Sequence, residues 1–254
     1  MQSEKQTPML DWFHKKKYLA DYLEGFVDIH NLILPGIDDG AKTVDDSLEL
    51  IREFGELGIR NFVATPHILQ PLYPNTRESI EEAHTVLMGA LLEQGLTQVA
   101  VEPAAEHMID DTFDDLLERE GLMPIRGGFL LVEMSYLQPS LNFEEAIIQI
   151  AKKGLTPILA HPERYAYLHQ RPKTYRKYKE HGILLQLNML SLGEYYGAEV
   201  QRMAHKLLSE GLIDFIASDA HGPRHLNALK EIRLKEKEAD SLLPVIQNTI
   251  QTFF

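Results

Sequence analysis

The stretch GFVDIHNLILPGIDDG, residues 25–40, decides how the rest of the chain is interpreted. Its first apolar residues predict a short strand that carries Asp28 and His30 to its end. A Pro-Gly turn follows, and the chain then reaches the acidic pair Asp38 and Asp39. Carboxylates and an imidazole gathered at a strand end are typical of a hydrolase metal site on an α/β scaffold. The stretch therefore predicts one part of such a site, which later strands should complete.

The composition is that of an ordinary globular protein, with 254 residues, 44% of them hydrophobic and 25% charged. The net charge of −13 argues against a nucleic-acid-binding protein. The sequence contains no cysteine, which excludes disulfides and thiolate metal sites and fits a cytoplasmic location. No apolar run is long enough to span a membrane, and the N-terminus lacks the apolar core of a signal peptide.

Short apolar runs alternate with amphipathic stretches along most of the chain. Strands are predicted over 26–30, 61–65, 98–104, 128–133, 156–160, 183–187 and 214–218. Helices are predicted over 43–58, 75–94, 110–118, 143–153, 173–180, 198–210, 226–235 and 239–253. Strands that alternate with helices indicate a parallel sheet, and this many units in one domain indicate a closed or nearly closed barrel.

The N-terminal part is expected to differ from the barrel. Residues 9–24 have the apolar spacing of a short amphipathic helix, so residues 1–25 are predicted to form a helical extension packed on a single domain of residues 26–254. Three consecutive lysines lie near Trp12. They are fewer than the clusters that bind lipid well, so a solvated helix end is favoured and at most a peripheral membrane association is expected.

Polar, titratable or metal-binding residues follow the predicted strands, at the end that carries the chemistry in barrels of this type. They are His30, His67, Glu106, Glu133, His161, Asn188, Asp219 and His221. A single histidine after a strand is usually packed or solvated, but Asp219 and His221 are two residues apart and point to the same side. Strand alternation points the His107 side chain away from that of Glu106, so His107 is expected to support the site or the core. Histidines with oxygen ligands suit manganese, with iron or zinc as alternatives, and their number implies two or three metals.

Two arginines fit a phosphate group. Arg164 follows His161 by three residues, and Arg224 follows His221 by three. Singly, such arginines are more often surface residues. Next to metal ligands they are reasonable substrate clamps, because a guanidinium binds phosphoryl oxygens in a bidentate manner. The chemistry expected from these residues is metal-assisted phosphoester hydrolysis.

The motifs DIHNLILPGIDDGAKT, ATPH, AAEH, LAHPERY and SDAH together resemble the bacterial polymerase-and-histidinol-phosphatase (PHP) superfamily. Within it, they are similar to the manganese-dependent protein-tyrosine phosphatases of capsule and exopolysaccharide operons, the CpsB/YwqE type. The resemblance runs from about Phe26 to His225, and ILPGIDDG with HPER is its most discriminating part. It implies a distorted (β/α)7 TIM-like barrel of the PHP type with three metals. It also implies that the substrate is the phosphotyrosine tail of a partner bacterial tyrosine kinase that controls polysaccharide export.

The resemblance also implies roles for individual residues. It places His30 at the first metal, Glu106 as a bridging carboxylate and Asp219 opposite. The implied metal ligands are His30, Asp39, His67, Glu106, His161, Asp219 and His221. Arg164 and Arg224 match the phosphate-binding arginines, so Asp219, Arg164 and Arg224 are the expected catalytic residues. Asp28 is expected to orient a ligand.

Leu32 departs from the family pattern. The family opens with His-x-His, whereas this chain has His30, Asn31 and Leu32. Leucine cannot bind a metal, and strand alternation points Asn31 away from His30. The first site is therefore expected to hold its metal weakly or not at all. The chain is then either a weakened two-metal enzyme or a pseudo-phosphatase that binds its partner, and the intact remaining ligands favour a retained metal centre.

A further alternative concerns the substrate. A small-molecule phosphatase of the histidinol-phosphatase kind is the second enzymatic interpretation, and ILPGIDDG with HPER argues against it.

The segments 68–75 and 191–197 are expected to border the site. Their residues Tyr73, Tyr195 and Tyr196 are candidates for stacking on a phosphotyrosine ring, with ordinary loop packing an equal alternative.

Overall fold

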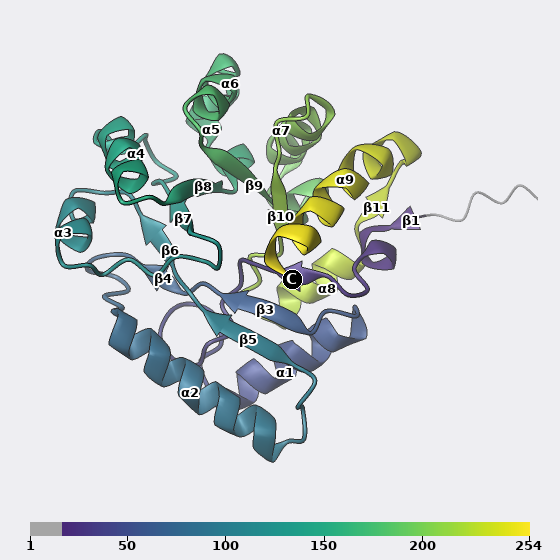
Figure 1. The fold of residues 1–254 in the computed structure, drawn as a ribbon. Coiled ribbons are helices and arrows are strands. Elements are labelled where there is room, and N and C mark those ends of the chain that lie inside the picture. The colour runs from purple at the N-terminus through teal and green to yellow at the C-terminus, as the bar shows by residue number, and fades with distance from the viewer. Residues whose placement is uncertain (1–16) are drawn as a thin grey trace, which may run out of the picture.

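The computed structural model of the chain describes residues 17–254 (Figure 1). The first half of the helix predicted over 9–24 thus lies outside the described residues. Where it can be compared, the prediction is wrong, because Lys17–Tyr18 form strand β1 and Leu19–Tyr22 form the 3-10 helix η1. Strand β1 pairs antiparallel with β11, Arg233–Leu234. This pairing joins residues far apart in the sequence, so local periodicity could not predict it.

The rest of the chain alternates between strands and helices, as predicted. The strands are β2 (Val27–Asp28), β3 (Asn61–Ala64), β4 (His67–Ile68), β5 (Ala100–Pro103), β6 (Glu106–Met108), β7 (Phe129–Glu133), β8 (Thr156–Ala160), β9 (Leu184–Asn188) and β10 (Phe215–Ala217). The helices are α1 (Val44–Glu56), α2 (Arg77–Glu93), α3 (Phe113–Glu118), α4 (Phe143–Lys152), α5 (Ala166–His169), α6 (Lys173–Glu180), α7 (Ala198–Ser209), α8 (Pro223–Lys230) and α9 (Glu236–Phe253). Two further 3-10 helices are η2 (Pro162–Arg164) and η3 (Met189–Leu192).

The barrel wall consists of parallel strands in two connected sheets. One sheet has the order β10-β9-β8-β7-β6-β4, and the other has the order β2-β3-β5. Strand β3 leads directly into β4, and β5 leads into β6. The bonds from the Ala104 N–H to the Ala64 carbonyl (2.9 Å) and from the Glu106 N–H to the Pro66 carbonyl (3.0 Å) span the interruption. Pro66 lacks an N–H group, which accounts for the break between β3 and β4, and the strand predicted over 61–65 corresponds to β3.

Backbone and side-chain bonds connect β10 to β2. The Ser218 N–H donates to Asp28 Oδ1 at 2.9 Å. One residue on, the Asp219 N–H donates to the His30 carbonyl at 2.8 Å, and the Leu32 N–H donates to the Ala220 carbonyl at 3.1 Å. These contacts bring the first and last strands of the wall together. The predicted TIM-like α/β barrel is confirmed.

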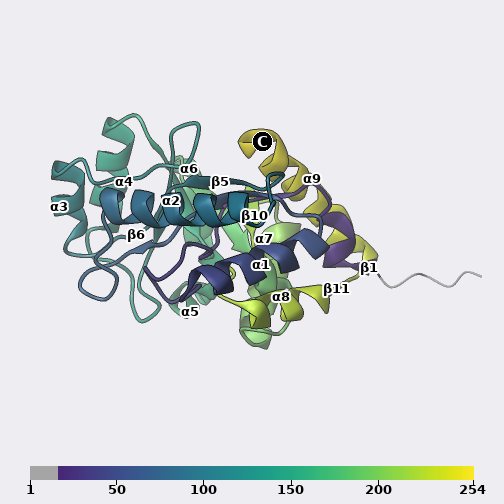
Figure 2. The same cartoon turned by 90° about the horizontal axis from the view of Figure 1, so that it is seen from below.

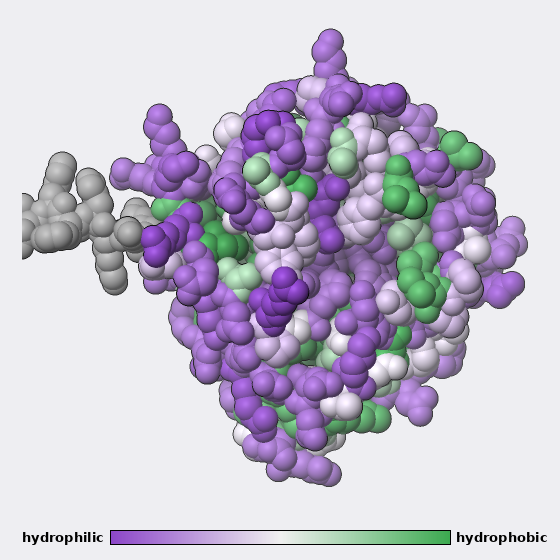
Figure 3. All heavy atoms as spheres, turned by 180° about the vertical axis from the view of Figure 1, so that it is seen from behind, coloured by the Kyte–Doolittle hydropathy of each residue, from purple (hydrophilic) through white to green (hydrophobic). Residues whose placement is uncertain are grey.

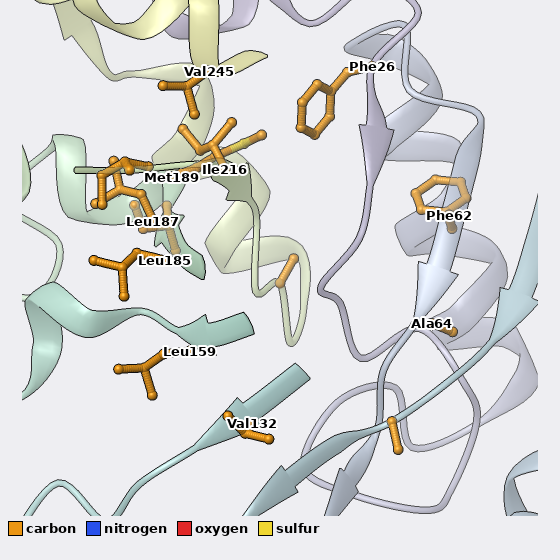
Figure 4. Packing of buried hydrophobic residues seen from close by; sticks show 14 of the residues in the cluster. Phe26, Phe62, Ala64, Val132, Leu159, Leu185, Leu187, Met189, Ile216 and Val245 are labelled. Atoms are coloured by element: carbon orange, nitrogen blue, oxygen red, sulfur yellow. The ribbon is translucent and has the colours of Figure 1, made fainter. Parts of the chain in front are cut away.

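Alternate residues of the strands face two different cores. Leu159, Leu185, Leu187 and Ile216 belong to a large outer cluster between the strands and the helices (Figure 4). A smaller cluster fills the barrel interior and is capped by Phe253 of α9, whose ring lies 4.9 Å from that of Phe215. Apolar side chains therefore close the end of the barrel where the strands begin. The polar groups are left at the other end.

Some helix ends lie where the capping residues in the sequence predict them, and others do not. Thr43 caps α1 as expected, accepting the Asp46 N–H, whereas α2 is capped by Thr76 and not by Asn75. The helix predicted over 226–235 begins earlier, because Pro223 occupies its first turn, and ends before β11. Over residues 17–254, each helix is too short or too polar to cross a lipid bilayer.

Candidate metal centre

The predicted site residues meet on one face of the barrel, where the strands end. In Figure 1 the C-terminus lies on the near side, and Figure 2 shows α5 and α8, which follow β8 and β10, on the opposite side. Figure 3 views that opposite side and shows a hydrophilic, hollowed centre. The site is thus on the face that carries the chemistry in barrels of parallel strands.

The deepest group contains His30, His161 and Asp219, whose ligand atoms lie within 4.8 Å of one another. The side chains are almost completely buried. His30 Nε2 lies 3.4 Å from Asp219 Oδ1 and 3.3 Å from Glu106 Oε1. His161 Nε2 lies 3.2 Å from the same Glu106 oxygen. Two imidazoles and two carboxylates therefore surround one point.

A second, more exposed group contains Asp39, His67 and His221. His67 Nε2 lies 3.5 Å from Asp39 Oδ1, and His221 Nε2 lies 3.8 Å from Asp39 Oδ2. The neighbouring Asp38 is buried, and its Oδ1 accepts the Gly40 N–H at 2.9 Å. The structure thus separates the roles of the acidic pair, because Asp39 faces the histidines whereas Asp38 holds the turn.

A third group joins the first two through Glu106. His67 Nδ1 lies 2.9 Å from Glu106 Oε2 and 3.1 Å from Glu133 Oε1. Because Glu106 Oε1 faces His30 and His161 while Oε2 faces His67, this carboxylate lies between the groups, as a bridging ligand would. Glu133 is absent from the ligand set predicted from the sequence. Its position at the end of the apolar run FLLVE was the available signal.

Buried atoms without hydrogen-bond partners indicate what the centre holds. Within residues 17–254, His30 Nε2, His67 Nδ1 and both carboxylate oxygens of Glu106 are buried and have no such partner. An unsatisfied buried polar atom costs about 1–3 kcal/mol, so several in one place require an explanation. All are atoms that bind divalent cations in proteins. The residues present therefore fit a centre of two or more divalent metals.

The acidic and imidazole groups of the centre shift one another's pKa values. Burial alone would lower the pKa of His30, but the Glu106 and Asp219 carboxylates outweigh it and raise this pKa to about 10. Burial would raise the pKa of Glu106, but His30, His161 and His67 hold it well below its usual range. Burial and the Arg164 charge lower the pKa of His161 to about 4. Negative charge is thus stabilised by nearby cations, and His161 is kept in the neutral form that binds metals.

Neighbouring side chains fix the orientation of the ligands. Gln186 Oε1 lies 2.8 Å from His30 Nδ1, so Nδ1 carries a proton and the ring is oriented with Nε2 toward Glu106. Asp28, expected to orient a ligand, instead accepts hydrogen bonds from the backbone and side chain of Ser218. Asp28 thus positions the segment that carries Asp219 and leaves the His30 ring to Gln186.

The backbone at two candidate ligands is unusual. Among the described residues, Glu120, His161 and Asp219 are the non-glycine residues with positive φ, and the last two have φ values of 36° and 50°. Such conformations are sparsely populated for residues with a side chain and are frequent at functional sites. Here they turn the chain sharply after β8 and β10, so that both side chains face Glu106 and His30.

The two arginines lie in different environments. Arg164 Nη1 donates to Asp219 Oδ2 at 2.7 Å, and its guanidinium lies between the rings of Tyr136 (4.7 Å) and Tyr196 (4.1 Å). Arg224 is exposed and lies 5.8 Å from the Tyr195 ring. The structure therefore places Arg164 at the centre and Arg224 at its edge.

The remaining aromatic and histidine residues near the ligands differ in how they lie relative to the metal centre. Tyr73 stacks on His67 with ring centroids 5.4 Å apart, so the segment 68–75 borders the site as expected. His107 points away from the centre, where its Nε2 accepts the Met123 N–H and its Nδ1 faces the Leu131 carbonyl. It therefore supports the fold. Tyr136, whose hydroxyl lies 3.2 Å from His161 Nε2, was not singled out from the sequence.

Leu32 is buried beside the candidate ligands. Its N–H bonds to the carbonyl of Ala220, the residue between Asp219 and His221. The side chain is 1% exposed, yet it belongs to neither hydrophobic cluster of the described residues. It thus occupies a position next to the centre without adding a ligand.

Comparison with known proteins identifies the family. The model of the family described as "Capsular polysaccharide synthesis, CpsB/CapC" matches residues 26–236. The chain belongs to the CpsB/CapC family. The resemblance predicted from the motifs is therefore confirmed. Among members of the CpsB/CapC family, the tyrosine-protein phosphatase YwqE of Bacillus subtilis is 30% identical over 220 residues, covering 86% of this chain and 87% of the relative.

Further relatives and structures agree. The tyrosine-protein phosphatase CpsB of Streptococcus pneumoniae is 26% identical over 77% of this chain and 82% of its own length. A crystal structure from the work on B. subtilis YwqE and S. pneumoniae CpsB, described as metal-dependent tyrosine phosphatases, superposes with a TM-score of 0.78. It covers 88% of this chain and 92% of that one at 30% identity. A zinc-bound amidohydrolase from Burkholderia shares only the fold, with a TM-score of 0.51 at 11% identity.

Proposed function

We propose that this chain is a metal-dependent phosphatase that hydrolyses phosphotyrosine in proteins. The observation that carries the proposal is the position of Glu106 between two groups of histidines, where buried ligand atoms without hydrogen-bond partners converge. Membership of the CpsB/CapC family supports it, since the relatives YwqE and CpsB are named tyrosine-protein phosphatases.

The metals would be held by side chains from different strand ends. The proposed ligands are His30, Asp39, His67, Glu106, Glu133, His161, Asp219 and His221. We propose manganese, with iron or zinc as alternatives, because imidazoles and carboxylates without thiolates suit these ions. When bound, divalent ions at such a centre supply an activated water and neutralise charge on the phosphoryl group.

The residues around the ligands would bind and orient the substrate. Asp219 Oδ2 accepts from Arg164 and from Asn188 Nδ2 (2.9 Å), which leaves Oδ1 facing His30. Arg164 would hold the phosphoryl oxygens, because its guanidinium lies beside the centre and is stacked between two tyrosine rings. Arg224, at the exposed edge, would add a second positive charge. Preorganised positive groups of this kind stabilise the charge that develops during phosphoryl transfer.

The proposed substrate is the phosphotyrosine tail of a bacterial tyrosine kinase of capsular or exopolysaccharide synthesis. The family description supports this assignment, since it names capsular polysaccharide synthesis. We further propose that the chain acts in the cytoplasm, where such a tail would be accessible. Residues 26–254 would act as one barrel domain and residues 1–25 as an extension.

Hydrolysis assays with manganese test the proposal. The wild-type protein should release phosphate from a phosphotyrosine peptide and from p-nitrophenyl phosphate, and Asp219→Ala should abolish both activities. Histidinol phosphate is the discriminating substrate, because faster hydrolysis of this compound than of the peptide would favour a small-molecule phosphatase. Matched circular-dichroism spectra of the two proteins ensure that the loss is not caused by unfolding.

A second candidate function follows from Leu32. The family resemblance implies a metal-binding histidine where this chain has the buried Leu32, so the centre would have one ligand fewer. A pseudo-phosphatase that binds a phosphotyrosine tail without hydrolysing it is consistent with this substitution. Binding of the phosphopeptide without phosphate release, in manganese-loaded protein, would favour it over the enzyme.

A further inference from the structure

A hollow of about 380 Å³ opens beside the metal centre, on the same face of the barrel. Its walls come from the chain just beyond three candidate ligands. Gln70 follows His67 by three residues, Met108 follows Glu106 by two, and Ser135 follows Glu133 by two. The hollow is therefore adjacent to the place where a phosphate would bind.

Exposed leucines lie on the segments that form this hollow. Leu141 lines it and is 97% exposed, and Leu137 on the same loop is 91% exposed. Leu72, two residues after Gln70, is 65% exposed. We call these three residues the leucine rim. In Figure 3, hydrophobic groups interrupt the hydrophilic surface on the side where α3 and α4 lie. A single exposed leucine needs no explanation, but several on the segments that form one hollow beside a catalytic centre indicate a contact surface.

The loop that carries two of these leucines is held by polar contacts. Ser140 Oγ donates to the Ile109 carbonyl at 2.5 Å, and Asn142 Nδ2 donates to the Asp110 carbonyl at 2.8 Å. Leu137 N–H donates to Ser135 Oγ at 3.2 Å. These bonds fix the loop in a conformation that directs Leu137 and Leu141 toward solvent. Their side chains contribute little to the folded core and are available to a partner.

The same loop connects the hollow to the metal centre. Tyr136, next to Leu137, has its hydroxyl 3.2 Å from His161 Nε2 and its ring 4.7 Å from the Arg164 guanidinium. A polypeptide whose phosphotyrosine reached Arg164 would therefore pass over Leu137 and toward the hollow. A small phosphorylated metabolite would not extend that far.

We infer that the leucine rim and its hollow bind the segment of the substrate polypeptide that adjoins the phosphotyrosine, through apolar side chains of that segment. This inference rests on the proposed function and adds a sequence preference to it. An acidic residue at the same place in the substrate would bind less well, because Asp110 and Asp111 also line the hollow.

The test compares peptide and small substrates. Leu137→Ser/Leu141→Ser should lower kcat/KM for a phosphotyrosine peptide with flanking leucines by about tenfold, the scale expected for two lost apolar contacts. The change should lie mainly in KM. Hydrolysis of p-nitrophenyl phosphate should stay within about twofold of the wild type. The matched control is Leu92→Ser, since Leu92 is 70% exposed on α2 and should have no effect on either substrate.

Equal kcat/KM values of the double variant and the wild type on the peptide would overturn the inference. An equal loss of kcat/KM on the peptide and on p-nitrophenyl phosphate, at unchanged thermal stability, would also overturn it, because the loop would then support the metal centre itself.

Binding of the fluorescently labelled phosphopeptide, followed by anisotropy, separates this inference from the proposed function. If the wild type hydrolyses nothing but binds the peptide more tightly than the double variant, the proposed activity fails and the docking surface stands. Equal binding by both proteins would overturn the docking surface, whatever the activity.

Discussion

The Arg164 guanidinium and the Asp219 carboxylate form a direct contact at the base of the metal centre, with Nη1 2.7 Å from Oδ2. The two residues are 55 positions apart in the sequence and follow different strands. The contact orients both groups, because it leaves Asp219 Oδ1 toward His30 and holds the guanidinium between Tyr136 and Tyr196. A candidate metal ligand and a candidate phosphate-binding group are thus positioned by each other.

Replacing Arg164 should therefore damage catalysis more than metal binding. In Arg164→Lys the positive charge remains, but the planar group that stacks between two rings and binds phosphate in a bidentate manner is lost. We expect kcat/KM for a phosphotyrosine peptide to fall about 100-fold, the scale of a lost transition-state contact. Metal content, measured by mass spectrometry, should be unchanged. Arg224→Lys is the control for an exposed arginine, and a larger loss in this variant than in Arg164→Lys would reverse the assignment.

Glu133 should prove to be a metal ligand. Its carboxylate lies 3.1 Å from His67 Nδ1, and burial together with the Glu106 charge raises its pKa to about 7. A bound cation would favour its ionised form, so Glu133→Gln should lower the metal content of the purified protein. Glu163→Gln is a matched control, because Glu163 is equally buried but accepts hydrogen bonds from Ser191 and Asn188. Equal metal contents in Glu133→Gln and the wild type would refute the assignment.

Leu32 offers a substitution that should add a metal ligand. In Leu32→His, an imidazole two residues after His30 would lie beside the segment of Asp219 and His221. We expect the metal content to rise by up to about one equivalent and the rate of hydrolysis to increase. Leu34→His is the control, since Leu34 is also fully buried but belongs to the outer hydrophobic cluster. That variant should be less stable and should bind no additional metal. A metal content in Leu32→His equal to that of the wild type would show that Leu32 does not replace a ligand.

Gly40 is required by the close approach of two backbone segments. A Cβ atom at this position would lie 2.1 Å from the Leu32 carbonyl oxygen and 2.4 Å from its Cβ. Gly40→Ala should therefore lower the free energy of unfolding by about 2 kcal/mol or more, because backbone atoms would have to move. In Gly55→Ala, within α1, a Cβ would have no neighbour within 4 Å. This control should gain up to about 1 kcal/mol from better helix propensity. Urea denaturation measures both changes, and equal stabilities of the two variants would contradict the packing argument.

Much of the site could be predicted from the sequence, because its residues follow strands that are recognisable as apolar runs. His30, Glu106, His161 and Asp219 are brought together simply because parallel strands end on one face of the barrel. Glu133 has the same kind of position, but an acid after a strand is as often exposed at a loop, so its role needed the distance to His67.

Other features could not be predicted because they depend on contacts between distant segments. The pairing of β1 with β11 replaced the helix expected around residue 18, and the continuation of the wall after Pro66 as strand β4 was not predicted. The stacking of Arg164 between Tyr136 and Tyr196 joins three loops whose relative positions are set only by the closed barrel. Spacing along the chain carries no information about such contacts.

Phosphate release from a phosphotyrosine peptide is the most direct test of the central claim, that metals held around Glu106 hydrolyse phosphotyrosine. The assay uses protein treated with a chelator, with and without added manganese, alongside Glu106→Gln prepared in the same way. We predict no release without metal, restored release with manganese in the wild type, and none in Glu106→Gln. Equal release by chelated and manganese-loaded wild type, or full activity of Glu106→Gln, would contradict the account.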